Sequence, residues 1–91
     1  MSRKNQVILH RLMKKGFHVK MSKHIKLTFV YRGQNTGIRT WISHGQKEIS
    51  DKLLNIMAEQ IHLSNQEFGE LVDCTLDENG LIALYNNKNL I

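Results

Sequence analysis

The sequence predicts a single α+β domain in which one helix is followed by a three-stranded antiparallel sheet and then by further helices. Two observations predict this order. Between residues 17 and 43, polar and apolar residues alternate, which is the two-residue period of half-buried strands. After residue 48, apolar residues recur every three or four positions, which is the period of amphipathic helices. The 91 residues suffice for one domain, 1–91, with a small core.

The first helix is expected over residues 3–15. Its apolar residues, such as Ile8 and Leu12, lie at helical spacings among lysines and arginines. The segment Lys14-Lys15-Gly16 is typical of a helix C-terminus. Cations favour the negative end of the helix dipole, and glycine accepts the left-handed conformation that ends many helices.

Two strands are expected next, over residues 17–21 and 21–32. In the second strand, Ile25, Leu27 and Phe29 alternate with polar residues, among them His24 and Lys26. Because successive strand side chains point to opposite faces, this strand has one buried face and one wet, basic face.

The parity of the residue numbers, even or odd, predicts how these two strands pair. Directly opposed residues of antiparallel strands share a face, so the connection must keep both apolar sets on the same side. A three-residue loop over residues 21–23 does so. It predicts that Lys20 lies opposite His24 and His18 opposite Lys26.

A third strand is expected after residues 33–37, whose Gly and Asn residues favour a hairpin loop of five or six residues. If Ile38 and Ile42 are buried, Arg39 and Trp41 join the basic outer face. A tryptophan beside cations there is a platform on which unpaired bases stack. In the simpler alternative, Trp41 packs in the core. The same parity rule brings His44 close to His24.

Helical periodicity resumes at Ile49 and predicts a helix over residues 49–61. Ser64 and Glu67, three residues apart, form a capping box that begins a short helix, and Asp77 can cap a last one. Helices on one face of a three-stranded sheet leave its other face free.

Charge is distributed very unevenly along the chain. Residues 1–47 contain 11 lysines and arginines and no acid, whereas residues 48–91 contain 2 lysines and 8 acids, for charges of +11 and −6. Such a basic half is the usual electrostatic footprint of a polyanion partner. A solvated basic surface, or one that binds an acidic protein, is the alternative.

Composition disfavours several classes of protein. Cys74 is the only cysteine, so an intrachain disulfide is excluded, and we expect it to be a small buried hydrophobe. The cysteine and the five histidines lack the close paired spacings of metal sites, so neither metal nor cofactor is expected. No apolar run approaches the roughly 18 residues of a membrane span. The basic start leads into polar residues rather than a signal peptide, so we expect a cytoplasmic protein.

The predicted outer face suits metal-free ribonuclease chemistry. That reaction needs a group of near-neutral pKa to carry protons, for which histidine is the natural choice, and cations to hold the phosphate. His24 is the candidate catalytic residue, and His18 and His44 are auxiliary candidates. The candidate cations are Lys20, Lys23, Lys26 and Arg39.

Several short matches extend this interpretation to a known family. The first helix ends in Gly16-Phe17, the second strand opens with Ser22-Lys23-His24, and Ile42-Ser43-His44 is followed by Lys47-Glu48-Ile49. In order and position these resemble the HicA toxins of bacterial and archaeal toxin-antitoxin modules. The resemblance covers roughly residues 7–72, within a core of about 3–72, and leaves residues 73–91 as a C-terminal helical extension.

The resemblance implies a double-stranded-RNA-binding-domain-like fold, α-β-β-β-α, with one or two extra C-terminal helices here. It implies messenger-RNA cleavage by the signature histidine, which falls on His24. Besides the cations named above, the candidate RNA-binding residues are Trp41, the stacking platform, and Lys47. The resemblance also implies a HicB-like antitoxin as partner. Ser22 and Lys23 stand where the family has Gly and Ser, and the family's proline before His44 is absent.

Three functional hypotheses therefore remain open at the level of sequence. The first is a metal-independent endoribonuclease toxin that uses His24 as general acid or base. The second is a non-catalytic RNA-binding domain with the same fold. The third is a protein-interaction module whose basic face meets an acidic partner.

Overall fold

The computed structural model of the chain describes residues 3–43, 45, 47–73 and 75–91. The elements follow in the order β1 (Arg3–Lys4), α1 (Asn5–Lys14), β2 (Phe17–Met21), β3 (His24–Tyr31), β4 (Gln34–Ser43), β5 (Glu48–Ile49), α2 (Asp51–Gln60), α3 (Asn65–Val72) and α4 (Glu78–Asn87). The predicted α+β class is confirmed, with a three-stranded antiparallel sheet and four helices in the described part of the chain. The predicted burial of Cys74 concerns a position outside the described residues.

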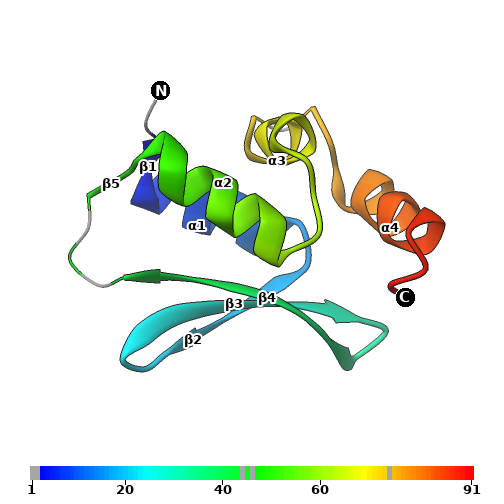
Figure 1. Cartoon of the computed structure of the whole chain (residues 1–91). Coiled ribbons are helices and arrows are strands. Elements are labelled where there is room, and N and C mark those ends of the chain that lie inside the picture. The colour runs from blue at the N-terminus through cyan, green and yellow to red at the C-terminus, as the bar shows by residue number, and fades with distance from the viewer. Residues whose placement is uncertain (1–2, 44, 46, 74) are drawn as a thin grey trace.

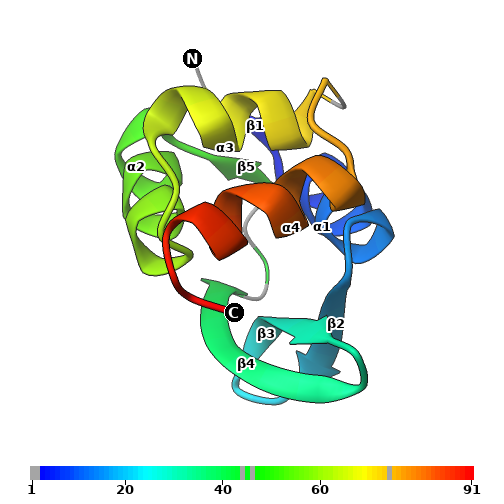
Figure 2. The same cartoon turned by 90° about the vertical axis from the view of Figure 1, so that its right-hand side faces the viewer.

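The sheet has the strand order β2-β3-β4, with β3 in the centre. Helices α1 and α2 lie along one face of this sheet (Figure 1). Helices α3 and α4 complete the helical side of the molecule (Figure 2). The layered arrangement follows from the alternation along the strands, because only one face of each strand is apolar.

The core is centred on the inward residues of β3. Leu27 and Phe29 are 0% exposed. The ring of Phe29 lies 5.3 Å from that of Phe17 in β2 and 5.2 Å, edge to face, from that of Tyr85 in α4. Such aromatic pairs add stabilisation beyond their buried area. Phe29 therefore joins the sheet to the C-terminal helix, which sequence analysis had left outside the family core.

The predicted starts of the first two helices are wrong, because the residues at both positions form the short antiparallel pair β1–β5. Arg3 pairs with Ile49 and Lys4 with Glu48, so α1 begins at Asn5 rather than at residue 3. Ile49 belongs to a strand rather than to the helix, although it is buried as its place in the apolar stripe predicted.

Helix α2 begins after Ser50, because the Ser50 hydroxyl accepts the Leu53 N–H at 3.3 Å and satisfies one of the free donors at the helix start.

The register predicted for β2 and β3 is wrong by two residues. Lys20 pairs with Lys26 and His18 with Thr28, while Met21 pairs with Ile25. The turn is closed by the Ser22 N–H, which donates to the His24 carbonyl at 3.2 Å. This register adds the Met21–Ile25 pair to the ladder, whereas the predicted one would have left Met21 in the loop.

The connection between β3 and β4 is shorter than predicted. Tyr31 pairs with Gln34, which leaves only Arg32 and Gly33 in the turn, with φ of 53° and 76°. Two successive positive φ values suit a two-residue hairpin turn. Gly37, expected in the loop, lies instead in an irregularity of β4 at φ 78°, where its N–H donates to the Asn35 Oδ1 at 2.7 Å.

The two predicted caps in the C-terminal part are confirmed. The Ser64 Oγ accepts the Glu67 N–H at 3.0 Å, and the Glu67 carboxylate accepts the Ser64 N–H at 2.8 Å, which completes the capping box. The Asp77 carboxylate accepts the Gly80 N–H at 2.8 Å at the start of α4. Short polar motifs therefore set the beginnings of α3 and α4.

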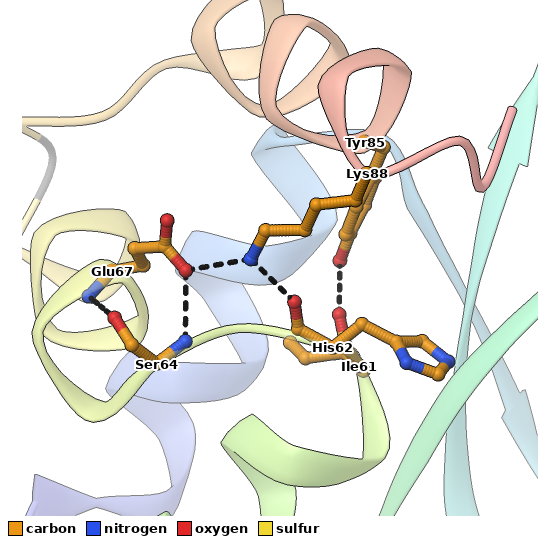
Figure 3. A network of polar contacts seen from close by, with 6 residues as sticks. All are labelled: Ile61, His62, Ser64, Glu67, Tyr85 and Lys88. Carbon is orange, nitrogen blue, oxygen red and sulfur yellow. Dashed lines mark hydrogen bonds and ion pairs between the residues drawn. The ribbon is translucent and has the colours of Figure 1, made fainter.

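Polar contacts hold α4 against the turn between α2 and α3 (Figure 3). The Tyr85 hydroxyl donates to the Ile61 carbonyl at 2.8 Å, and its burial raises the pKa of that hydroxyl. The Lys88 ammonium donates to the His62 carbonyl at 2.7 Å and to the Glu67 carboxylate at 2.8 Å. Because Leu81 and Tyr85 are 0% exposed, α4 is a part of the core.

Replacement of Tyr85 by phenylalanine tests this attachment. Tyr85→Phe leaves the buried Ile61 carbonyl without its hydroxyl donor, and we expect it to lower the free energy of unfolding by about 1–3 kcal/mol. Urea denaturation measures the change. Tyr31→Phe, at the half-buried second tyrosine, is the matched control and should change stability much less. Equal effects would contradict the assigned contact.

Acidification tests the Glu67 contacts. The hydrogen bond from Lys88, followed by that from the Ser64 N–H, lowers the pKa of Glu67 below 4.5. A depressed folded-state pKa contributes stability above the unfolded pKa, and this contribution is lost as pH falls through the folded value. Wild type should therefore exceed Glu67→Gln in stability at neutral pH, and the difference should vanish in acid.

The measurement is the free energy of unfolding of both proteins across this pH range. Glu70→Gln, at an exposed position of the same helix, serves as the control. A difference between wild type and Glu67→Gln that persists unchanged below the pKa of Glu67 would show that charge is not its cause.

Candidate nucleic-acid interface

The outward side chains of the sheet form one basic surface, which we call the outer face. It consists of His18 and Lys20 from β2, His24, Lys26 and Thr28 from β3, and Arg39, Trp41 and Ser43 from β4. All of these are exposed except Thr28, which is half-buried. The alternation is set by the opposite side of the same strands, where Leu27 and Thr40 are 0% exposed.

The strand registers arrange the outer face in three rows across the sheet. The first contains His24 and Ser43, the second Lys20, Lys26 and Trp41, and the third His18, Thr28 and Arg39. Neighbouring rows are two residues apart along β3, which corresponds to about 6.8 Å. The second row therefore lies between His24, the candidate catalytic residue in the first row, and the residues of the third row.

Trp41 lies on the outer face and not in the core, which decides between the two alternatives drawn from the sequence. Its exposed fraction is 43%, while Ile38 and Ile42 on the other side of β4 are each 3% exposed. Thr40 is held inward because its hydroxyl donates to the Gln60 Oε1 of α2 at 2.5 Å. The contact between β4 and α2 thus fixes the direction of Trp41.

The outer face contains cations and no acid. Residues 17–43, which form the three strands and their turns, contain five lysines and arginines and no Asp or Glu. The acids of the chain are confined to residues 48–91, and most of them belong to or flank the helices. Five of the 11 lysines and arginines of residues 1–47 therefore belong to the sheet and its turns, without an acid among them, as a polyanion-binding surface requires.

His24 is exposed at the beginning of β3, opposite Ser43 and next to the turn residue Lys23, which is also exposed. The predicted approach of His44 to His24 concerns a residue outside the described ones, although its neighbour Ser43 does pair with His24. His18 lies in the third row, four residues along β3 from His24, or about 13 Å. The sheet therefore does not bring His18 and His24 to one phosphate.

Lys47 is exposed but lies away from the outer face, in the segment that precedes β5. Its carbonyl accepts the Asn5 N–H at 2.9 Å. Together with Lys4, Leu9 and Ile25 it lines an open cavity of about 930 Å³ at the start of α1. A role for Lys47 in RNA binding stays a prediction, and it would require RNA to reach past the end of β3.

Two outer-face residues were not singled out from the sequence. Ser43, which pairs with His24, and Thr28, which pairs with Arg39, are both small and polar. The alternation of polar and apolar residues placed both on the outer face of the sheet. Neither serine nor threonine suggests RNA binding by itself, so they were not chosen as candidates.

The described residues contain neither a metal-binding cluster nor a helix that could span a membrane. Among the described residues, no group of three or more His, Cys, Asp and Glu side chains is arranged to hold a metal ion. None of the helices in the described ranges has the length and apolarity needed to cross a bilayer.

No protein-family model, curated protein or solved structure to which the chain was compared matches it. Any likeness to the HicA toxins therefore depends on the short matches in the sequence, and the outer face has to be interpreted from its own chemistry.

The outer face predicts a salt-dependent affinity for RNA. Lys26→Ala removes a cation from the middle row and should weaken binding to an RNA oligonucleotide. The slope of log Kd against log salt should fall by roughly 1, the value for one lost phosphate contact. Lys52→Ala, an exposed lysine on α2, is the matched control, and fluorescence anisotropy measures both. Equal effects of the two substitutions would place RNA elsewhere.

Proposed function

We propose that this protein is a metal-independent endoribonuclease that binds RNA across the outer face and cleaves it with His24 as general acid or base. The observation that carries the proposal is the combination found on the outer face. An exposed tryptophan and an exposed histidine lie among lysines and arginines with no acid in the three strands. Cations provide phosphate affinity and histidine provides proton transfer near neutral pH.

The reaction fits a histidine that is open to solvent. His24 removes the proton from a ribose 2′-oxygen, and that oxygen attacks the adjacent phosphorus. The bond from phosphorus to the 5′-oxygen of the next nucleotide breaks, and this oxygen takes up a proton from a second acid. The products are a 2′,3′-cyclic phosphate end and a 5′-hydroxyl end. Nearby lysines stabilise the charge that develops on the phosphoryl oxygens.

We propose a second acid other than His18, because the strand register places His18 four residues along β3 from His24, or about 13 Å. His44 is the proposed candidate because strand parity in the sequence predicts that it lies near His24; it is outside the described residues. Lys23, beside His24 in the turn, is proposed to hold the phosphate.

The proposal includes the family suggested by the sequence. The order α1-β2-β3-β4-α2, with helices on one face of a three-stranded sheet, agrees with the double-stranded-RNA-binding-domain-like fold of HicA toxins. We accordingly propose a cytoplasmic mRNA interferase of the HicAB type. Its partner is proposed to be a HicB-like antitoxin, for which the positive outer face offers a complementary surface to acidic groups.

Substitution of His24 tests the proposal. His24→Ala should reduce RNA cleavage by about 10²- to 10⁴-fold, the usual contribution of a general acid or base. Its unfolding free energy should stay close to that of wild type because the side chain is exposed, and its RNA affinity should change little because the lysines and arginines of the outer face are kept. Cleavage of a labelled transcript is measured in EDTA, where wild type should keep its activity.

His10→Ala is the matched control, because His10 is exposed on α1 and lies outside the outer face. Full activity of His24→Ala would reject the role of His24. RNA binding without cleavage by wild type would favour the non-catalytic RNA-binding domain, which the Ser22-Lys23 replacement of the family's Gly-Ser also allows. Absence of RNA binding at low salt would favour the protein-interaction module.

A further inference from the structure

We infer that the outer face selects unpaired RNA by stacking one base on Trp41, and that the bond cleaved lies one nucleotide from this base. The inference rests on the proposed function for the cleavage reaction. It adds the class of RNA that is bound and the position of the bond that is cleaved. It follows from the place of Trp41 in the sheet and from the distance between rows.

Trp41 is presented for stacking. It lies on the edge strand β4, with 43% of its surface exposed, directly across from Lys26 of β3. Trp41 also lines a hollow of about 120 Å³ together with Leu53 and Ile56 of α2. An exposed aromatic ring next to cations is the arrangement with which proteins bind single-stranded nucleic acids.

A duplex would not use this residue. In a duplex the base faces are stacked on one another, so a protein sheet lying against it meets only sugars, phosphates and base edges. The Trp41 ring would then have no base to stack on, although the cations around it would still be neutralised. An unpaired strand offers both its phosphates to the lysines and a base face to Trp41.

The rows set the position of the cut. His24 lies in the row next to that of Trp41, on the neighbouring strand, and such diagonal neighbours are about 7–8 Å apart. A single nucleotide of an extended strand can bridge this distance. With its base on Trp41, the strand places an adjacent phosphate at His24, while Lys20 and Lys26 of the Trp41 row lie beside the nucleotide that is held.

Because the chain has a single tryptophan, its fluorescence reports on Trp41 alone. We would titrate His24→Ala, which binds without cleaving, with an unpaired oligouridylate, a blunt RNA duplex and heparin, a polyanion without bases. Quenching is expected with oligouridylate. Heparin and the duplex should bind to the lysines and arginines by electrostatic attraction but should quench the Trp41 fluorescence much less. Equal quenching by heparin or the duplex, or none with oligouridylate, would overturn the inference.

Affinity is then measured by anisotropy of labelled oligouridylate. Trp41→Ala should weaken binding by about 5- to 150-fold, the range for loss of one base stack, whereas Trp41→Phe should keep most of the affinity. Val7→Ala is the matched control, because Val7 of α1 is 40% exposed and apolar but lies outside the outer face. Unchanged affinity in Trp41→Ala would overturn the inference.

The cut is mapped by sequencing the ends of RNA cleaved by each protein with His24 intact. Because stacking accepts every base, the RNA carries one abasic nucleotide. Wild type and Val7→Ala should cut less at the bond one nucleotide from it than at other bonds, whereas Trp41→Ala should cut these bonds equally. Equal cutting of these bonds by active wild type would overturn the inference and leave the proposed function in place. Quenching by unpaired RNA with no cleavage would support the stacking and reject only the nuclease.

Discussion

The burial of one side of the central strand is the constraint on which the rest of this molecule depends. Leu27 and Phe29 are completely buried, and Phe29 packs its ring between Phe17 of β2 and Tyr85 of α4. A strand whose inward residues are held this firmly cannot rotate, so its alternate residues must face solvent. The same packing that builds the core therefore presents His24 and Lys26 on the outer face.

The C-terminal helices contribute to this constraint from a distance. Tyr85 brings α4 against Phe29, and its hydroxyl, together with the Lys88 ammonium, secures α4 to the turn after α2. Helix α2 in turn holds β4 through the Thr40–Gln60 hydrogen bond, which keeps Trp41 on the outside. Residues beyond the family-like core thus support the outer face without belonging to it, and substitutions there are expected to act through stability.

The sequence alone predicted which face of the sheet a strand residue occupies better than it predicted which residues pair across neighbouring strands. Parity determines whether a residue such as Trp41 can share a face with Lys26, but it permits a register shift of two residues, and this shift replaced the expected Lys20–His24 pair by Lys20–Lys26. The pairing of β1 with β5 was missed because two residues carry no periodic signal. Gly37 was assigned to a loop because glycine suits turns and strand irregularities alike. Caps such as Ser64 were predictable because their spacing has a local cause.

The central claim is that RNA lies on the outer face of the sheet. Its most direct test is the change in backbone and tryptophan indole NMR signals when the His24→Ala variant is titrated with a short unpaired RNA. The changes should concentrate at Lys20, Lys26, Arg39 and Trp41, and should be small on α3 and α4. Changes confined to the helices, or none at low salt, would contradict the account.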